Sequence, residues 1–454
     1  MSSLDVERIR SHFDFVRTGR VVTNNAASTQ PPRELIDLFH RLAPTYENVH
    51  RGQSAASRRT TELFEASYDT IAAWLNAPSR RCVATYRNAT EAINAVMYTL
   101  LTEFRDGDNV VTTLLEHNSN FVPWHALCRE ILPRLGRRVE CRLARFDAAG
   151  NVDLEHLASL VDERTKLICC TGASNFFGSK TDLAAVRRIA DAGGYPQPTG
   201  ERRALLLVDG AQLVPTSAVD GQALDVDYLA FSFHKMLAPF GVGVLYAKEH
   251  LLDHGLPFLY GGDMIAEGRV TRTAVSWNDL PWKYAAGTPD ILGVIVSAQA
   301  LRLLLDLVLP TAFFGGTGPL PRVAIEEAMA RVGAHTASLT ARCLAALSEI
   351  NGLRAYGPPH RTPLVSFNVP GVSPFALAEA LDDRGVESRA GCHCATLAHH
   401  ALGLDPPASC RLSFALYNTA GDVDRATEAV AAVSAGLRPA CPAPAARPAG
   451  RPGR

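Results

Sequence analysis

Two short runs decide the fold of this chain: Val208-Asp209-Gly210-Ala211-Gln212 and Ser232-Phe233-His234-Lys235. Each run follows an apolar segment of the kind that forms a buried strand, so each starts where a strand is predicted to end. Lys235 lies 26 residues after Asp209. Open α/β sheets bind their ligands at the carboxyl ends of parallel strands, and the acid and the lysine are therefore expected to share one site.

Short β-branched runs alternate with helical patterns from about residue 81 to residue 248. This alternation predicts an α/β fold with an open, largely parallel sheet and helices on its faces. The first strand leads through the turn Asn88-Ala89-Thr90 into a helix. The predicted strands are Arg81–Tyr86, Asn109–Thr113, Lys166–Thr171, Ala204–Asp209, Tyr228–Ser232 and Val242–Ala247.

The pattern changes after Pro321, where a long helix is followed by the strand Leu364–Val369, the helix Pro374–Arg384 and the strand Arg411–Leu416. This succession indicates a second, smaller α+β domain. Two polar or glycine-rich stretches, Gly193–Arg203 and Phe313–Pro321, are predicted to be surface loops.

We therefore expect four parts in the chain. They are an N-terminal segment (1–29) that packs on the small domain, a large domain (30–290), a small C-terminal domain (291–437) and a disordered tail rich in Pro, Ala and Arg (438–454).

The composition is that of an ordinary globular protein, and it excludes several functions. Hydrophobic residues make up 47% of the 454 residues, and 45 Lys+Arg against 46 Asp+Glu leave a net charge of -1. A chain so close to neutral lacks the basic surface expected of a nucleic-acid binder. The most apolar stretch, Ile291–Leu309, contains Arg302 and Asp306, so we expect no membrane span.

The first residues, Met1–Arg20, carry charges before any apolar run, unlike a secretory signal, and we expect a cytoplasmic protein. Its ten cysteines are scattered and are expected to be free thiols in a reducing compartment.

A lysine, an acid and a set of donors for a phosphate are what pyridoxal 5'-phosphate requires of a protein. Lys235 is predicted to bind this cofactor covalently, and Asp209 to keep its pyridine nitrogen protonated so that the ring acts as an electron sink. The helix that opens at Ala89-Thr90 offers free N–H groups and the positive end of its dipole to the phosphate. Taken alone, this Thr is first of all a helix cap. Two further donors lie close to the lysine: Ser232 and His234.

The chain resembles the class V aminotransferase superfamily of fold-type I pyridoxal-phosphate enzymes, and within it the group II cysteine desulfurases and selenocysteine lyases. The matches run in family order over nearly the whole chain. Besides the two runs quoted above, the matching segments are 49–52 (VHRG), 87–94 (RNATEAIN), 116–124 (EHNSNFVPW), 261–265 (GGDMI), 286–289 (AGTP), 389–395 (RAGCHCA) and 410–419 (CRLSFALYNT).

The resemblance implies a mostly parallel seven-stranded sheet in the large domain and roles for further residues around the cofactor. His117 matches a residue that stacks on the pyridine ring and shuttles protons. Gln212 and Asn175 match groups that hydrogen-bond near the phenolic oxygen of the cofactor. Gly262 and Thr288 match phosphate contacts that come from the neighbouring subunit, which implies a homodimer with shared active sites.

The resemblance also implies how a small amino-acid substrate is bound. Arg411 matches the residue that grips the substrate carboxylate, a task suited to its planar, bidentate guanidinium. Arg389 matches a second contact near the same group, although a surface ion pair would also explain an arginine there. Asn24-Asn25 stands where Asp-Ser is more usual ahead of two alanines, and Asn25 is expected to face the substrate.

Cys394 matches the nucleophilic cysteine on the mobile loop of the desulfurases. The resemblance implies that its thiolate takes sulfur, or selenium, from L-cysteine or an analogue, which leaves alanine and an enzyme persulfide for a possible sulfur-acceptor protein. A free thiol has a pKa of about 8.5, so a neighbour such as His393 is needed to activate it. The chain departs from the family here, because Cys392-His393-Cys394 replaces His-His-Cys and His399-His400 follows.

Two other interpretations use the same residues. The cysteines and histidines between residues 392 and 400 are potential zinc ligands, but two thiols one residue apart do not match the usual spacing of about two to four intervening residues, and we predict no metal site. The second is a C–S lyase, decarboxylase or epimerase of specialised metabolism that acts on a cysteine conjugate or another amino acid. Lys235 and Asp209 would suffice for that chemistry, without Cys394.

Overall fold

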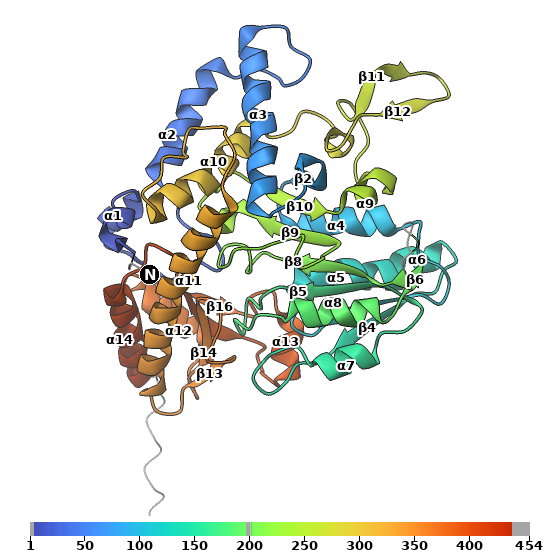
Figure 1. Cartoon of the computed structure of the whole chain (residues 1–454). Helices are drawn as coiled ribbons and strands as arrows, with labels where there is room; N and C mark the ends of the chain where they lie inside the picture. Colours follow the sequence, from blue (N-terminus) through green and yellow to red (C-terminus); the bar gives the residue numbers. More distant parts are fainter. Residues whose placement is uncertain (1–3, 197–199, 201, 438–454) are drawn as a thin grey trace, which may run out of the picture.

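A computed structural model describes residues 4–196, 200 and 202–437 of the chain. At its centre lies a seven-stranded sheet in the order β2-β10-β9-β8-β5-β3-β4, in which every strand but β10 runs parallel (Figure 1). The mostly parallel seven-stranded sheet expected from the sequence is therefore confirmed. Its strands are β2 (Val83–Tyr86), β3 (Asn109–Thr113), β4 (Glu140–Ala144), β5 (Thr165–Thr171), β8 (Leu205–Asp209), β9 (Tyr228–Ser232) and β10 (Gly243–Ala247).

The six strands predicted from the sequence are all present, with small shifts at their ends. β2 begins only at Val83, because Arg80–Cys82 form a 3₁₀ turn ahead of it. The sequence reasoning missed β4, which lies at the edge of the sheet. Its residues, Glu140–Ala144, include two charged side chains and are mostly half-exposed, so they lack the apolar run by which a buried strand is recognised.

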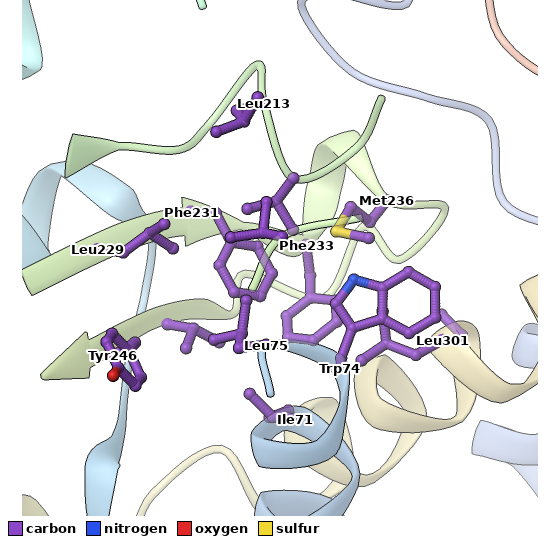
Figure 2. Packing of buried hydrophobic residues seen from close by; sticks show 14 of the residues in the cluster. Ile71, Trp74, Leu75, Leu213, Leu229, Phe231, Phe233, Met236, Tyr246 and Leu301 are labelled. Atoms are coloured by element: carbon purple, nitrogen blue, oxygen red, sulfur yellow. The ribbon is translucent and has the colours of Figure 1, made fainter. Parts of the chain in front are cut away.

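Helices cover both faces of this sheet. Successive residues of a strand point to opposite faces, so neighbouring residues of one strand pack against different helices. On one face Leu205 and Leu207 pack with α4 (Ala89–Leu100) and the segment that follows α5 (Asn118–Ala126). On the other face Leu206 and Val208 join the core that includes α3 (Ala55–Trp74), α8 (Leu183–Asp191) and α10 (Ile291–Val308). Figure 2 shows Ile71 and Trp74 at the end of α3 against Phe231, Phe233 and Leu301.

A second core surrounds a four-stranded sheet in the order β13-β14-β17-β16. These strands are antiparallel, and α11, α12 and α14 contribute to the same core. The bounds are β13 (Arg354–Tyr356), β14 (Leu364–Asn368), β16 (Arg389–Gly391), β17 (Ser409–Ser413), α11 (Arg322–Ser348), α12 (Pro374–Asp382), α13 (Thr396–Ala401) and α14 (Ala420–Leu437).

The core of the large sheet extends past residue 291, where the sequence analysis expects the small domain to begin. α10 packs along α3 and α2 (Arg33–Leu42), and its apolar side chains belong to the core of the large sheet. Within α11, Val332 still joins that core, whereas Leu339 joins the second. One long helix therefore spans both cores, and a continuous helical pattern carries no signal of the change.

The N-terminal segment joins the two cores. β1 (Val21–Val22) pairs in parallel with β15 (Val386–Glu387) of the second core, while Phe13 and Phe15 pack on Tyr417. The remaining elements are α1 (Val6–Arg10), α6 (Leu132–Arg134), α7 (Leu154–Ser159), α9 (Glu249–His254), β6 (Tyr195–Pro196), β7 (Arg202–Arg203), β11 (Ile265–Val270) and β12 (Val275–Trp277).

The two predicted loops and the tail have different outcomes. The ends of Gly193–Arg203 pair as the short antiparallel strands β6 and β7, whereas Phe313–Pro321 contains no helix or strand. The tail 438–454 lies outside the described residues.

One helix among the described residues, α10, is long and apolar enough to cross a membrane by length and composition. Of its 18-residue window, 89% is buried inside the protein. This burial explains the high hydropathy of α10, which fills the core beside α3.

A glycine of β10 sets the distance between the sheet and the turn before α4. A Cβ at Gly243 would lie 2.3 Å from the backbone carbon of Asn88. We expect Gly243→Ala to lower the free energy of unfolding by about 1–3 kcal/mol, since the backbone must move to relieve the clash. Urea unfolding measures this. Gly318→Ala, where a Cβ meets nothing within 4 Å, is the control, and equal stability of the two variants would contradict the packing argument.

Candidate active site

A cavity of about 260 Å³ lies at the carboxyl ends of β8 and β9. Asp209 is the last residue of β8, Ser232 is the last residue of β9, and Lys235 ends the single turn that follows. The structure thus brings together residues that are far apart in the sequence. Of the expected site residues, the cavity is lined by Ala89, Thr90, His117, Asn175, Asp209, Gln212, Ser232, His234, Lys235, Arg389 and Arg411.

Lys235 and Asp209 are the charged pair at the base of this cavity. Burial lowers the pKa of the Lys235 ammonium to about 8, against the effect of the Asp209 carboxylate, which raises it. The charges of Arg411 and Arg389 lower it further. Asp209 is itself buried, and burial raises the pKa of its carboxyl although its oxygen accepts a hydrogen bond from the N–H of Ala211. The lysine therefore exchanges a proton near neutral pH.

The start of α4 forms another wall of the cavity. Asn88 caps this helix by accepting a hydrogen bond from the N–H of Glu91, and the hydroxyl oxygen of Ser232 accepts one from the N–H of Ala89. These two bonds leave the N–H of Thr90 without an acceptor among the described residues. A free N–H at a helix start, together with the helix dipole, suits an anion such as a phosphate.

His117 caps the next helix, α5, and this contact determines which ring nitrogen carries the proton. Nδ1 accepts a hydrogen bond from the N–H of Ser119 at 3.1 Å. Burial, followed by the charges of Lys235 and Arg389, lowers the pKa of His117 to about 3, so the ring is neutral. Its hydrogen is therefore on Nε2. His234, also at the cavity, has a pKa lowered to about 4, first by burial and then by Lys235.

Arg411 presents one edge of its guanidinium without a partner. Nη1 donates to the carbonyl of Asn175 at 2.7 Å, whereas the buried Nε and Nη2 have no acceptor among the described residues. Nε and Nη2 lie on the same edge, which is the arrangement that binds a carboxylate through two parallel hydrogen bonds. Burial lowers the pKa of Arg411 to about 9, and Arg389, opposite it across β16 and β17, lowers it further.

Arg389 lies beside Arg411 and forms no ion pair with any residue in the described part of the chain. The alternative of a surface ion pair is therefore not what the structure shows. Two positive groups stand at one end of the cavity instead, which favours an anionic group of a ligand there.

Asn25 does not line the cavity, in contrast to the expected substrate contact. Its amide nitrogen donates to the carbonyls of Val22 and Ser413 and to the side chain of Asn418, and its oxygen accepts from Tyr417. The whole amide is thus used to attach the N-terminal segment to the second core. Its neighbours Ala26 and Ala27 line the cavity, and the side chain of Gln212 donates to the carbonyl of Ala26 at 2.7 Å.

Cys394 lies on a tightly held turn next to the cavity but is not among its lining residues. Both His393 and Cys394 have positive φ angles, 52° and 58°. The carbonyl of His393 accepts a hydrogen bond from the side chain of Asn175, and the carbonyl of Cys394 accepts one from the N–H of Asn118, each at 2.6 Å. The thiol is half-buried and close enough to act electrostatically on Lys235 and Arg411.

Gly262 and Thr288 lie away from this cavity and are exposed. The N–H of Gly287 donates to the carbonyl of Gly262 at 2.8 Å, which joins the two segments near the hairpin of β11 and β12. Figure 1 shows this hairpin projecting from the body of the protein. Within one chain, therefore, neither residue reaches the site.

Two more polar residues line the cavity: Ser119, which the sequence analysis did not name, and His393, which it named only as a neighbour of Cys394 and a potential zinc ligand. The hydroxyl of Ser119 lies 2.6 Å from that of Thr90, and it stands two residues after His117 at the start of α5. His393 faces the cavity although it lies between two cysteines that do not. Among the described residues, no group of three or more His, Cys, Asp or Glu side chains is placed to hold a metal ion.

The chain is similar to known proteins over nearly its whole length. The family model "Aminotransferase class-V" matches residues 21–312 and 321–426. A probable cysteine desulfurase of Halobacterium salinarum is 35% identical over 94% of this chain and 96% of its own length. A cysteine desulfurase of Dickeya dadantii is 34% identical over 92% of this chain and 94% of its own length.

Solved structures agree with these matches. The cysteine desulfurase CsdA of Escherichia coli superposes with a TM-score of 0.82 at 28% identity, over 96% of this chain and all of the other. The cysteine desulfurase of Thermococcus onnurineus, in its apo form, gives 0.83 at 27% identity over the same shares. The chain belongs to the class-V aminotransferase family of pyridoxal-phosphate-dependent enzymes.

Proposed function

We propose that this protein is a cysteine desulfurase that transfers the sulfur of L-cysteine, or the selenium of its analogue, to Cys394. The observation that carries the proposal is the convergence of Lys235, Asp209 and the free edge of Arg411 on one cavity. The turn that carries Cys394 is pinned beside this cavity through Asn175 and Asn118.

The residues of the cavity fit pyridoxal phosphate in the chemistry of each contact. Lys235 binds the cofactor covalently, Asp209 pairs with the pyridine nitrogen, and the start of α4 at Ala89-Thr90 binds the phosphate. Ser232 and His234 line the cavity beside them. When bound, the cofactor supplies an electron sink that stabilises negative charge on the substrate carbons.

Further residues orient the cofactor and the substrate. The neutral ring of His117, fixed by its cap of α5, would stack on the cofactor, and Gln212 and Asn175, which line the same cavity, would hydrogen-bond to it. Arg411 binds the substrate carboxylate through Nε and Nη2, and Arg389 adds a second positive charge. Lys235, whose pKa is about 8, takes up and returns protons near neutral pH.

Cys394 is the proposed nucleophile. Its thiolate attacks the sulfur of the bound substrate, a sulfur–sulfur bond forms, and the carbon–sulfur bond breaks with its electron pair left on carbon. That carbon takes up a proton and becomes the methyl group of alanine, and Cys394 is left as a persulfide. A sulfur-acceptor protein then removes the persulfide sulfur.

The proposed assembly is a cytoplasmic homodimer in which Gly262 and Thr288 of one subunit contact the phosphate in the other. Their exposure and their distance from the cavity of their own chain support this arrangement. The adjoining hairpin also exposes apolar side chains at Val270, Val275 and Trp277, which a partner subunit would cover.

A second candidate function rests on one observation, namely that Cys394 does not line the cavity. A C–S lyase, decarboxylase or epimerase that acts on a cysteine conjugate or another amino acid would use Lys235 and Asp209 alone. The same cavity would then serve, and the thiol would be dispensable.

Replacing the nucleophile separates these two functions. In an assay that contains a thiol reductant to release the persulfide sulfur as sulfide, we expect Cys394→Ala to keep the cofactor bound but to reduce the release of alanine and sulfide from L-cysteine to background, because no thiolate is left to take the sulfur. Product analysis beside the native enzyme measures this, and Cys392→Ala is the matched control. Undiminished alanine and sulfide would contradict the desulfurase, and pyruvate with ammonia, insensitive to the change, would establish a lyase.

The carboxylate site is tested by Arg411→Lys. An ammonium group cannot replace the two parallel hydrogen bonds of the guanidinium, so KM for L-cysteine is expected to rise on the order of tenfold or more. Steady-state kinetics measure it. Arg342→Lys, at an exposed ion pair with Asp424, should leave KM as it is. An unchanged KM in Arg411→Lys would rule out this role.

The acidity of Lys235 predicts how fast the cofactor attaches. Only the neutral amine reacts, so the rate of covalent attachment to the apoenzyme should rise with pH up to about 8, the pKa of Lys235, and level off above it. Borohydride trapping and mass spectrometry follow the reaction, and Lys235→Ala should show none.

In Asp209→Asn the midpoint of this profile should move down, since the carboxylate raises the pKa of the lysine. A midpoint near the ordinary lysine value of about 10.4 would contradict the assignment.

A further inference from the structure

A chain of hydrogen bonds behind the cavity connects α13, β17 and the turn before Cys394. Nδ1 of His399 lies 2.9 Å from the carbonyl of Ala395, and Nε2 of His399 lies 3.1 Å from the hydroxyl of Ser409. The same hydroxyl lies 3.0 Å from Nε2 of His393. All three side chains are buried, with exposed fractions of 0% for His399 and Ser409 and 3% for His393.

The direction of every bond in this chain follows from its first member. A carbonyl only accepts, so Nδ1 of His399 carries the hydrogen and its Nε2 is an acceptor. The single hydrogen of the Ser409 hydroxyl is then donated to His399. His393 must in turn donate from Nε2 to the oxygen of Ser409.

His393 is neutral, so its Nδ1 carries no hydrogen. Burial, followed by the charges of Arg411, His399 and Arg389, holds the pKa of His393 well below its usual range. Nδ1 is buried and has no hydrogen-bond partner among the described residues. A buried acceptor without a partner is costly, and such an atom calls for a ligand.

The position of His393 indicates where that ligand lies. The ring lines the cavity, whereas Ser409 and His399, on its Nε2 side, do not. Asn175 joins His393 to the substrate-binding arginine, because its side chain donates to the carbonyl of His393 and its own carbonyl accepts from Arg411. His393 and Arg411 both line the cavity, and their buried Nδ1, Nε and Nη2 atoms have no hydrogen-bond partner among the described residues.

This set is complementary to an amino acid that carries a carboxylate and, on its side chain, a hydrogen-bond donor. L-Cysteine has such a donor in its S–H group, whereas an S-substituted cysteine conjugate has none on its sulfur. A site built to bond a donor rejects an analogue that lacks it, since the buried acceptor is then left unpaired.

We propose that Nδ1 of His393 accepts a hydrogen bond from the thiol of free L-cysteine and selects it against S-substituted conjugates, and that Ser409 and His399 are positioning residues that keep this nitrogen free of hydrogen. The inference rests on the proposed function and specifies its substrate. No proton is transferred in this contact, and the sulfur stays an S–H group that the thiolate of Cys394 can attack.

The positioning residues give the test, because neither touches the substrate. In His399→Leu the hydroxyl of Ser409 loses its acceptor and is free to donate to Nε2 of His393, which moves the ring hydrogen to Nδ1. In Ser409→Ala the bond that holds the hydrogen on Nε2 is absent. His400→Leu is the matched control, since His400 lies next to His399 on α13 but is exposed.

The probe is L-2-aminobutyrate, in which a methyl group replaces the S–H group of L-cysteine. The holoenzyme is assayed with L-cysteine, and the measured quantity is the ratio of the Ki of L-2-aminobutyrate to the KM of L-cysteine. We expect this ratio to fall about fivefold in His399→Leu and in Ser409→Ala, the worth of one neutral hydrogen bond, and to stay unchanged in His400→Leu.

An unchanged ratio in both variants, or an equal fall in His400→Leu, would overturn the proposal. If His399→Leu does not fold, Ser409→Ala, which removes a single oxygen atom, decides the question. The proposed function is judged separately, by the products and their dependence on Cys394, so either conclusion can fail without the other.

Discussion

The burial of a lysine next to a carboxylate is the constraint on which the site depends. Lys235 and Asp209 are both removed from bulk water, and each is held at the end of a strand of the central sheet. Two such groups are costly to bury unless they face one another or a ligand. β8 and β9 are parallel neighbours and end at the same edge of the sheet. Asp209 and Lys235 therefore line the same cavity.

The second core completes this arrangement. Arg411 on β17 and His393 on the turn after β16 both reach the cavity, and both are hydrogen-bonded to Asn175, which follows β5 of the large sheet. Asn175 therefore fixes both residues, His393 through its side-chain amide and Arg411 through its main-chain carbonyl. The N-terminal segment adds a second link, since Asn25 is bonded to β17 while the adjoining Ala26 is bonded to Gln212.

Whether an element could be predicted from the sequence depends on how clearly its own residues show its burial and its contacts. β3 and β9 were predicted at their observed bounds because they are short, rich in β-branched or apolar residues, and wholly buried. β4 was missed because it is an edge strand with half-exposed, charged residues. The domain boundary at residue 291 stays a prediction. The sequence pattern of α10 and α11 is that of two ordinary helices, and only their contacts reveal which core each one fills. The motif predicts Asn25 near the substrate, and this role stays a prediction; in the structure its amide is hydrogen-bonded to the backbone around it.

The sequence by itself determined the fold class and the cofactor, and it predicted one site for Lys235, Asp209 and Arg411, because alternating strand and helix patterns and the spacing of motifs are local properties of a chain. Only the tertiary structure decided which hydrogen bonds those residues have left to offer. The free edge of Arg411 and the unpartnered Nδ1 of His393 each follow from partners that lie far away in sequence or on another element. A donor or acceptor that is already paired inside the protein is no longer available to a ligand. Finding which groups are paired requires the positions of both partners.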